Sequence, residues 1–263
     1  MDVGIRTLAE QDLHVLTPVN TTGAQTVQLG AAGVAADGRR YRYVTFGGTS
    51  TIAPGRVVTV PATTANYQGL VITAVGTSGQ VTANLSAGSY TLVLTNGATA
   101  VTQDQFAEGY LELLVGSAGA SGSYSLKIKG NTAAAASGAI TVFLYEPLFN
   151  TTALVPGTDT ANLNTSIYSG VNTSTTAAIV AGVTVVPVPN TASVSYAGWV
   201  QTHGPALVLN DAGGTITVGG GFAQSVSVAG SVVASSASAA PIIGTTRKAI
   251  TASTTGPVYL RVE

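Results

Sequence analysis

The chain of 263 residues carries ten Lys and Arg, eleven Asp and Glu and no cysteine, which gives a net charge of −1 at pH 7. Charged residues make up 8% of the sequence, whereas an ordinary globular domain has about 25%. This composition excludes disulfide bonds and cysteine-based metal sites, and it gives no long-range field that would attract nucleic acid or an anionic membrane. A weakly charged surface does little to keep protein molecules apart, so we expect a protein that binds other proteins.

The first 24 residues differ from the rest of the chain. Their apolar positions fit neither the helical nor the strand period, so residues 1–24 predict an extended N-terminal arm that orders against a partner, with a frayed terminus as the alternative. The segment lacks the basic stretch and apolar run of a secretory signal. The longest apolar run, residues 177–189, is too short for a membrane helix, and Thr184 and two prolines interrupt it.

From about residue 25 onward the pattern is that of β-strands. Residues 39–46 (RRYRYVTF) alternate: one face holds Arg39, Tyr41 and Tyr43, and the other holds Arg40, Arg42 and Val44. This period of two is expected for a strand with one buried face. The same alternation is found in residues 90–95 and 122–129. Further strands are expected at 56–60, 70–75, 109–115, 181–188, 196–202, 206–209, 215–218, 224–233 and 257–262.

Short strands at this spacing, separated by Gly-rich turns, predict an all-β fold made of antiparallel β-sandwich or β-barrel domains. Residues 139–145 (AITVFLY) are apolar on both sides and predict a covered central strand. The only segment that suggests a helical turn is 102–114, with Asp104 as a possible N-cap.

Loop-like residues 146–170 separate two β regions. We therefore expect the arm at 1–24, a first β domain at 25–150, a connecting segment with one or two strands at 151–192, and a C-terminal β domain at 193–263.

A nucleophilic catalytic site needs a Ser, a base and an orienting group held together. Serines are frequent throughout, the only strong candidate base is His203, and no GxSxG motif is present. We therefore predict no catalytic residue and no enzymatic activity. His203 is expected to cap a turn before Gly204-Pro205 or to pack at an interface.

The sequence predicts neither a metal site nor a cofactor site. The two histidines, His14 and His203, are far apart and no cysteine can assist them. No lysine follows a Gly-rich loop of the P-loop type, and Gly-rich residues 218–224 lie outside any βαβ unit. Glu108 and Glu112 could form a glycosidase pair, but two solvated side chains are the favoured interpretation.

The arginine cluster at 39–42 could bind nucleic acid, but alternation splits it across both faces of a strand. Asp37 lies beside it, which favours a salt bridge between subunits over a nucleic-acid groove. Trp199 offers a large apolar face and one donor, as expected for a core or interface anchor. The predicted interface residues are Arg39, Arg40, Tyr41, Arg42, Tyr43, Trp199 and His203.

Four short stretches carry a resemblance when they are taken in this order: DGRRYRYV (37–44), EGYL (108–111), YSLKIKG (124–130) and GWVQTHGPA (198–206). From about Leu29 to Val233 the chain resembles tailed-bacteriophage head proteins of the decoration, or cement, type, including ones from cyanophages and other aquatic phages. A tryptophan is frequent in that family where His203 stands, which implies a packing role for this side chain.

The resemblance implies a structural virion protein. Such proteins bind the outer surface of the phage head, often as trimers near threefold positions, and staple neighbouring major capsid proteins against internal DNA pressure. The implied partners are the major capsid protein of an HK97-like shell and further copies of this chain, with a trimer favoured. The implied location is the capsid exterior, after assembly in the host cytoplasm. Contacts repeated by symmetry can raise overall affinity by about 10²–10⁴.

Two other functions stay open. A receptor- or glycan-binding tail fibre or adhesin would share the Thr-, Ser- and Gly-rich β composition, although the Phe, Trp and Tyr residues, 6% of the chain, are spread thinly. A polysaccharide-cleaving enzyme ranks last. Copy number separates a cement protein from a tail fibre protein, because a cement protein is present in hundreds of copies per particle and a fibre protein in tens or fewer.

Overall fold

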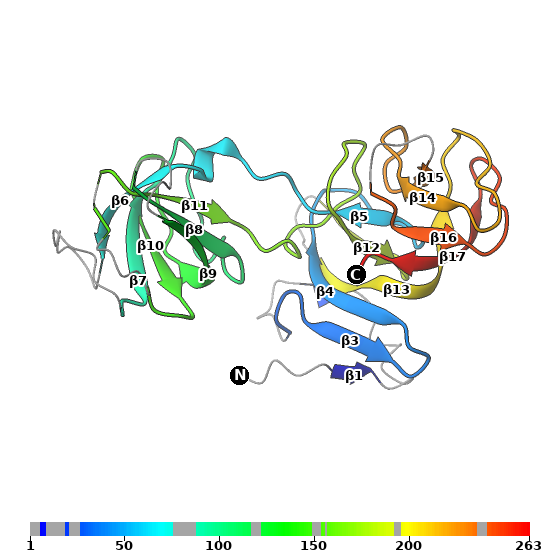
Figure 1. Cartoon of the computed structure of the whole chain (residues 1–263), viewed down its shortest axis with the longest axis horizontal. Helices are drawn as coiled ribbons and strands as arrows, with labels where there is room; N and C mark the ends of the chain where they lie inside the picture. The colour runs from blue at the N-terminus through cyan, green and yellow to red at the C-terminus, as the bar shows by residue number, and fades with distance from the viewer. Residues whose placement is uncertain are drawn as a thin grey trace. The chain divides into compact units, whose positions relative to one another are not determined.

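The computed structural model describes residues 6–8, 19–20, 27–75, 88–116, 122–148, 154–155, 157–191, 196–235 and 241–263. The chain contains 48% strand and 2% helix, and the helical part includes one 3-10 turn, η2 (Ala65–Tyr67) (Figure 1). The all-β prediction is therefore confirmed. The predicted arm at 1–24 lies outside the described residues, except for the short strands β1 (Arg6–Leu8) and β2 (Val19–Asn20).

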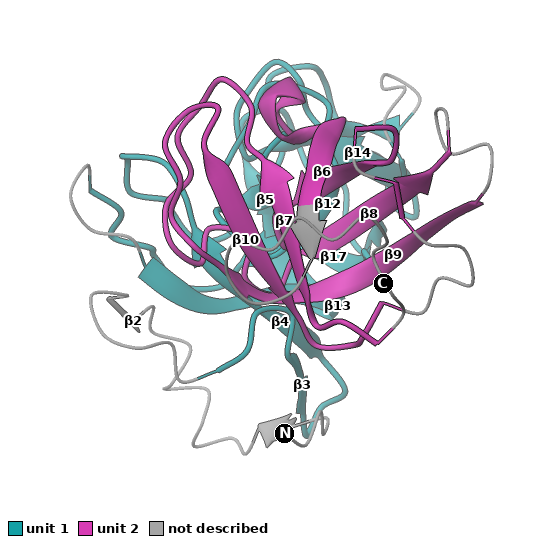
Figure 2. Ribbon diagram, turned by 90° about the vertical axis from the view of Figure 1, so that its left-hand side faces the viewer, with its two compact units in different colours: residues 1–62, 167–263 teal, residues 63–166 magenta. Residues whose placement is uncertain are grey.

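The chain forms two compact units (Figure 2). Unit 1 comprises Met1–Ala62 and Ile167–Glu263, and unit 2 comprises Thr63–Ser166. Unit 2 is therefore an insertion in the sequence of unit 1. This division differs from the expected one at 25–150, 151–192 and 193–263, because strand pairing in unit 1 joins segments from both ends of the sequence.

Unit 1 contains one sheet of eleven strands among the residues described. Its main path runs β1-β3-β4-β13-β17-β16-β14-β15, and β2, β5 and β12 attach to it. The pairings are antiparallel except between β1 and β3. Besides β1 and β2, its strands are β3 (Ala32–Ala35), β4 (Arg40–Phe46), β5 (Val57–Thr59), β12 (Val180–Thr184), β13 (Tyr196–Leu209), β14 (Gly221–Gln224), β15 (Val232–Ala234), β16 (Gly244–Thr246) and β17 (Thr255–Arg261).

Strand β13 is the longest strand of unit 1 and joins two segments that the sequence predicts as separate strands, 196–202 and 206–209. The Gly204-Pro205 pair does not end it. The pairing with β4 shifts register between Gln201 and His203, and Gly204 adopts a φ of +95°. Such a bulge bends a strand without breaking it. His203 thus lies inside a strand, which corrects its expected role as a turn cap.

Both faces of β4 are covered by core, whereas its alternation predicts one buried face. Tyr41 and Tyr43 pack in one buried cluster, whereas Val44 and Phe46 pack in another on the opposite face. Arg40 and Arg42 share the second face but lie at its outer end, where the strand meets solvent. Beta-branched and aromatic residues suit a strand that is buried on both sides.

Unit 2 contains a closed antiparallel barrel with the strand order β10-β7-β6-β11-β8-β9. Alternate residues of each strand point inward to an apolar core that includes Leu94, Leu113, Ile128 and Ile140. Closure leaves no unpaired edge in the barrel. Its strands are β6 (Leu70–Val75), β7 (Thr91–Thr95), β8 (Tyr110–Val115), β9 (Gly122–Asn131), β10 (Ala139–Leu144) and β11 (Thr160–Asn164).

Strand β10 is not covered on both faces, contrary to the prediction for residues 139–145. Ile140 and Val142 point into the barrel, but Phe143 and Tyr145 are each about two-fifths exposed. The run is apolar on both sides because its outward positions include aromatic residues. The outer surface of the barrel therefore exposes aromatic side chains to solvent.

The helical turn predicted at 102–114 is wrong. Residues 103–108 form turns and β8 follows at once. Asp104 adopts a φ of +56°, and its carboxylate accepts a hydrogen bond from the backbone N–H of Asn131 at 3.2 Å. The side chain of Asn131 in turn accepts a hydrogen bond from the N–H of Phe106 at 2.8 Å. A residue distant in sequence therefore organises this loop.

The strand predicted at 224–233 is only partly confirmed, and the one predicted at 215–218 is wrong. Gln224 ends β14 and residues 232 and 233 lie in β15, but residues 225–231 form a turn between the two strands, because the Ser225 hydroxyl accepts hydrogen bonds from the N–H groups of Ser227 and Val228. Residues 215–218 contribute only one isolated bridge, between Ile216 and Ile250. Alternating Ser and Val mimic a strand, while serine hydroxyls also stabilise turns.

Candidate functional site

Trp199 and Tyr43 lie in the core of unit 1. Each side chain is 6% exposed, and their rings meet edge to face with centroids 5.3 Å apart at 70°. This geometry is favourable for an aromatic pair. Of the two roles expected for Trp199, the structure places it in the core, where it offers almost no surface to a partner.

Tyr41 is also buried, with 1% of its surface exposed. Among the residues described, its hydroxyl has no hydrogen-bond partner, and the guanidinium carbon of Arg39 lies 5.9 Å from its ring centroid. Burial raises the pKa of the Tyr41 phenol above its usual value, and burial does the same to the pKa of Tyr43. The tyrosine pair thus packs the sheet.

Arg39 pairs with an acidic residue of its own turn. Its Nε lies 2.6 Å from Oδ2 of Asp37, and its backbone N–H donates to Oδ1 of Asp37 at 3.1 Å. That backbone hydrogen bond is the main cause that lowers the pKa of Asp37 below its usual value. The pair therefore fastens the turn between β3 and β4.

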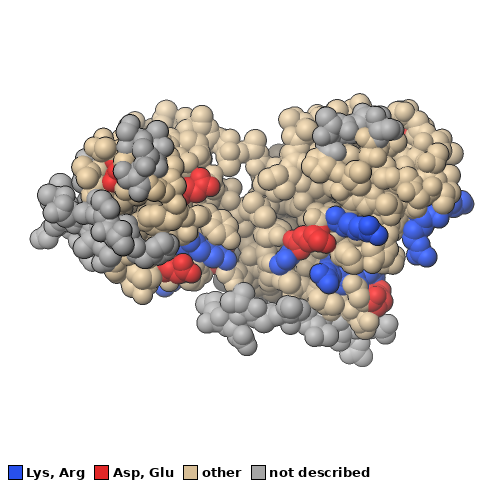
Figure 3. All heavy atoms as spheres, viewed as in Figure 1, with Lys and Arg blue, Asp and Glu red and all other residues tan. Residues whose placement is uncertain are grey.

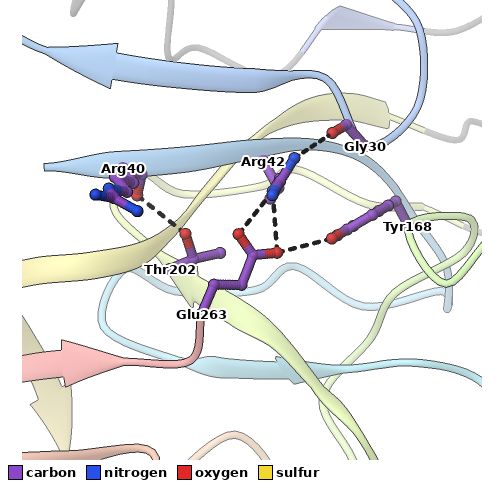
Figure 4. A network of polar contacts seen from close by, with 6 residues as sticks. All are labelled: Gly30, Arg40, Arg42, Tyr168, Thr202 and Glu263. Carbon is purple, nitrogen blue, oxygen red and sulfur yellow. Dashed lines mark hydrogen bonds and ion pairs between the residues drawn. The ribbon is translucent and has the colours of Figure 1, made fainter. Parts of the chain in front are cut away.

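Arg42 lies at the centre of a polar network that joins three segments of unit 1 (Figure 4). Its Nε donates to both carboxylate oxygens of Glu263 at 2.9 and 2.8 Å, and its Nη1 donates to the carbonyl oxygen of Gly30 at 2.9 Å. The hydroxyl of Tyr168 donates to Glu263 at 2.8 Å. Arg39 and Arg42 thus each form an ion pair within the chain.

Arg40, His203 and Arg261 form one row across three adjacent strands. His203 of β13 is the register partner both of Arg40 on β4 and of Arg261 on β17. Residues paired in this way lie side by side across the sheet. Neither arginine forms an ion pair with a residue that the structure describes. We call these three residues the cation row.

His203 has aromatic neighbours and lacks the partners of a catalytic base. Its ring lies 5.2 Å from that of Tyr259, edge to face, and its Nδ1 is buried without a hydrogen-bond partner. Over the described ranges no carboxylate pairs with it. Because a catalytic base needs an orienting partner, the arrangement around His203 favours packing.

In the described part of the chain, no group of three or more His, Asp and Glu side chains could hold a metal ion. Over the same part, no helix is long and apolar enough to cross a membrane. Glu108 and Glu112, the pair considered as carboxylates of a glycosidase, bind different partners: Lys127 pairs with Glu108, and Asn162 donates to Glu112.

A shallow groove of about 410 Å³ in unit 1 has a volume in the range of small-molecule sites. Its polar side chains are already engaged, however. Gln201 donates to the carbonyl oxygens of His203 and Pro205, and Arg39 pairs with Asp37. The groove therefore offers few convergent polar groups to a ligand.

The outer surface of the barrel carries exposed aromatic residues, which the sequence analysis did not single out. Tyr90, Tyr110, Phe143 and Tyr145 are 39–55% exposed, and all large exposed hydrophobic residues of unit 1 that the structure describes are aliphatic. Tyr110 is the register partner of Lys127, and the N–H of Tyr145 donates to the Lys127 carbonyl oxygen. Two tyrosines thus flank one lysine across three strands.

Glu108 joins Lys127 and Tyr145 into a fixed group on this surface. Its carboxylate lies 3.1 Å from the Lys127 ammonium and accepts a hydrogen bond from the Tyr145 hydroxyl at 2.5 Å. This hydrogen bond is the main cause that raises the pKa of Tyr145 to about 12. A strand pattern could have indicated the outward tyrosines, but not the turn that brings Glu108 to them.

The chain was compared with models of known protein families, with curated protein sequences and with solved structures. None of them matched. On the face shown in Figure 3, charged side chains are few and wide areas carry none among the described residues.

Proposed function

We propose that this chain is a structural virion protein, a capsid decoration or cement protein that binds the outer surface of a phage head. In this role it staples neighbouring major capsid proteins of an HK97-like shell against internal DNA pressure. It acts as a homo-oligomer, with a trimer favoured, and as a non-enzymatic component. It is assembled in the host cytoplasm and resides on the capsid exterior.

One observation carries the proposal: both units expose large apolar side chains on a surface that bears little charge. Examples that are more than half exposed include Ile179, Leu207 and Ile242 in unit 1 and Tyr90 in unit 2. Scattered exposed hydrophobic residues are normal. Here few charges accompany them, and such a surface favours contact with protein over isolation in solvent.

The rigidity of the units supports the same function. A staple must resist deformation, and every strand of the barrel is paired on both sides. In unit 1, Arg42 and Glu263 join β4 to the residues that follow β17. The specific placement on a phage head rests on the resemblance in sequence, which covers segments of both units.

The test is to strip heads of this protein and to compare their resistance to heat and to low ionic strength with that of intact heads. Stripped heads should burst under milder conditions, and adding the purified protein back should restore resistance. Quantitative mass spectrometry should find hundreds of copies per particle. Equal resistance of stripped and intact heads would refute the stapling role.

A second candidate function, receptor or glycan binding, is favoured by the outer surface of the barrel. Exposed tyrosines flank Lys127, and carboxylate and amide side chains lie on the adjoining strands. Planar aromatic faces beside fixed hydrogen-bonding groups are suited to sugar rings. Replacing Tyr110 and Tyr145 with alanine should abolish adsorption to host cells if this function holds, and should leave adsorption unchanged in a cement protein.

A further inference from the structure

A small depression in unit 1 lies beside Arg261, at one end of the cation row. Its floor includes Val180, Ile243 and Val262, which belong to or pack on the core of the unit. Its rim carries Ile179 and Ile242, which are 66% and 61% exposed. Exposed apolar side chains grouped around one hollow mark a site of interaction with another molecule.

The size of the depression limits what can enter it. Its volume is about 190 Å³, below the roughly 300–1,000 Å³ of cofactor and drug-sized sites. One large apolar side chain fits such a space better than a cofactor does. In protein interfaces, side chains of this kind fill pockets on the partner and supply much of the binding energy.

The wall of the depression is fixed by hydrogen bonds. Gln224 is 1% exposed; its Oε1 accepts a hydrogen bond from the N–H of Ala178. Its Nε2 donates to the carbonyl oxygens of Ser174 and Thr176. The segment that carries Ile179 is therefore held in place before any partner arrives, which lowers the entropy cost of binding.

Arg261 and Arg40 lack a counter-charge within the described part of unit 1. The acidic side chains there are Asp37, Asp211 and Glu263. Asp37 pairs with Arg39 and Glu263 pairs with Arg42, while Asp211 is buried and accepts hydrogen bonds from Gly213 and Ser225. The guanidinium carbon of Arg261 lies 5.8 Å from the ring centroid of Tyr259. Both arginines are thus available to carboxylates from another molecule.

We propose that the depression and the cation row together form the docking surface for an extended acidic segment of a partner protein, which inserts one apolar side chain beside Arg261. Arg40 and Arg261 are two strands apart, so their backbones are about 10 Å apart. In an extended segment, side chains two residues apart lie on the same face about 7 Å apart, and the long Arg and Glu side chains bridge the remaining difference. The inference deepens the proposed function, on which its second experiment rests.

The first experiment uses the full chain and synthetic peptides, with the methyl signals of Ile179 and Ile242 observed by NMR. The probe is Ac-SESESLS-NH2, in which two glutamates and a leucine follow one another at every second position and so share one face of an extended chain. The controls are Ac-SQSQSLS-NH2, without charge, and Ac-SESESSS-NH2, without the apolar side chain. The acidic and apolar peptide should shift both methyl signals in a saturable way and bind about tenfold more tightly than either control.

Matched variants locate the effect. R261Q and I242N should each weaken binding of the probe about tenfold, whereas R247Q and V218N, at exposed positions outside the depression, should leave it unchanged. Unfolding midpoints check that all four variants fold. Equal binding of the neutral peptide, no shift of the two methyl signals, or equal losses in the control variants would overturn the inference.

The second experiment measures rebinding of the same variants to stripped heads. R261Q and I242N should occupy fewer sites than the two control variants. If all variants rebind as the wild type does, the docking surface is refuted and the proposed function stands. If the wild-type chain itself does not bind heads, the proposed function is refuted, and the peptide experiment still decides the docking surface.

Discussion

Nε of Arg42 lies 2.9 and 2.8 Å from the two carboxylate oxygens of Glu263, a residue 221 positions later in the chain. Both side chains are about 30% exposed, so water and salt screen the pair. We expect E263Q to lower the free energy of unfolding by no more than about 1 kcal/mol. Urea unfolding at low and high salt measures this, and the loss should shrink at high salt. E146Q, at an exposed site, is the control, and a loss that is unchanged by salt would contradict the prediction.

Trp199 should contribute much more to the free energy of unfolding than the pair of Arg42 and Glu263 does. Because it is buried against Tyr43, W199A would leave a cavity and lose the edge-to-face contact, at a cost of about 3–5 kcal/mol. Circular dichroism during chemical unfolding measures the effect, since the variant contains no tryptophan to report by fluorescence. L207A, at a position 59% exposed, should change stability by less than about 0.5 kcal/mol. A small effect of W199A would place Trp199 outside the core.

The raised pKa of Tyr145 leads us to expect a loss of stability at alkaline pH. Its pKa in the folded protein is about 12, above the usual value of about 10. Its contribution is therefore fully present below about pH 10 and is lost as the pH rises towards about 12. Titrating the ultraviolet absorbance of tyrosinate should show one fewer high-pKa tyrosine in Y145F. In E108Q, the pKa of Tyr145 should fall towards its usual value, and an unchanged titration curve would argue against the hydrogen bond.

Gly204 should resist substitution more than Gly38 does. Both adopt a positive φ, +95° and +84°, which costs a residue with a side chain of order 1 kcal/mol or more. At Gly204 an added Cβ would also lie 3.1 Å from Cγ of Arg39, whereas nothing lies within 4 Å at Gly38. Thermal unfolding should therefore show a larger loss for G204A than for G38A. Equal losses would mean that Arg39 moves aside without cost.

Unit 2 should fold when residues 63–166 are produced alone. Its core cluster contains no residue of unit 1, and its barrel is closed without strands from unit 1. Heating the fragment should give one cooperative transition by circular dichroism. A fragment without dispersed NMR signals would show that the barrel depends on unit 1.

The strands themselves could be predicted well from the sequence. In residues 39–46, the alternation separated Tyr41 and Tyr43 from Val44, and the structure confirms that the two sets lie on opposite faces. Local alternation reports which side of a strand is buried, because side chains point to alternate faces. The all-β class follows from many such segments with Gly-rich turns between them.

The division into units could not be predicted in the same way. The pairing of Tyr43 with Trp199 joins residues far apart in the chain, and alternation within a strand carries no information about its partner. Pro205 was interpreted as the end of a strand, but the bulge before it lets β13 continue. The sequence pattern is the same whether Trp199 lies in the core or at an interface. The structure was needed to place it in the core.

The nesting of unit 2 within unit 1 affects how the chain responds to tension. A pulling force applied at the two outer ends of unit 1 must first separate the strands of its sheet, because residues 63–166 form a loop between them in the sequence. The inserted barrel would begin to carry load only after β4 and β13 had come apart. Unit 1 should therefore unfold before unit 2 under tension, and unit 2 is not stretched until the sheet of unit 1 has separated.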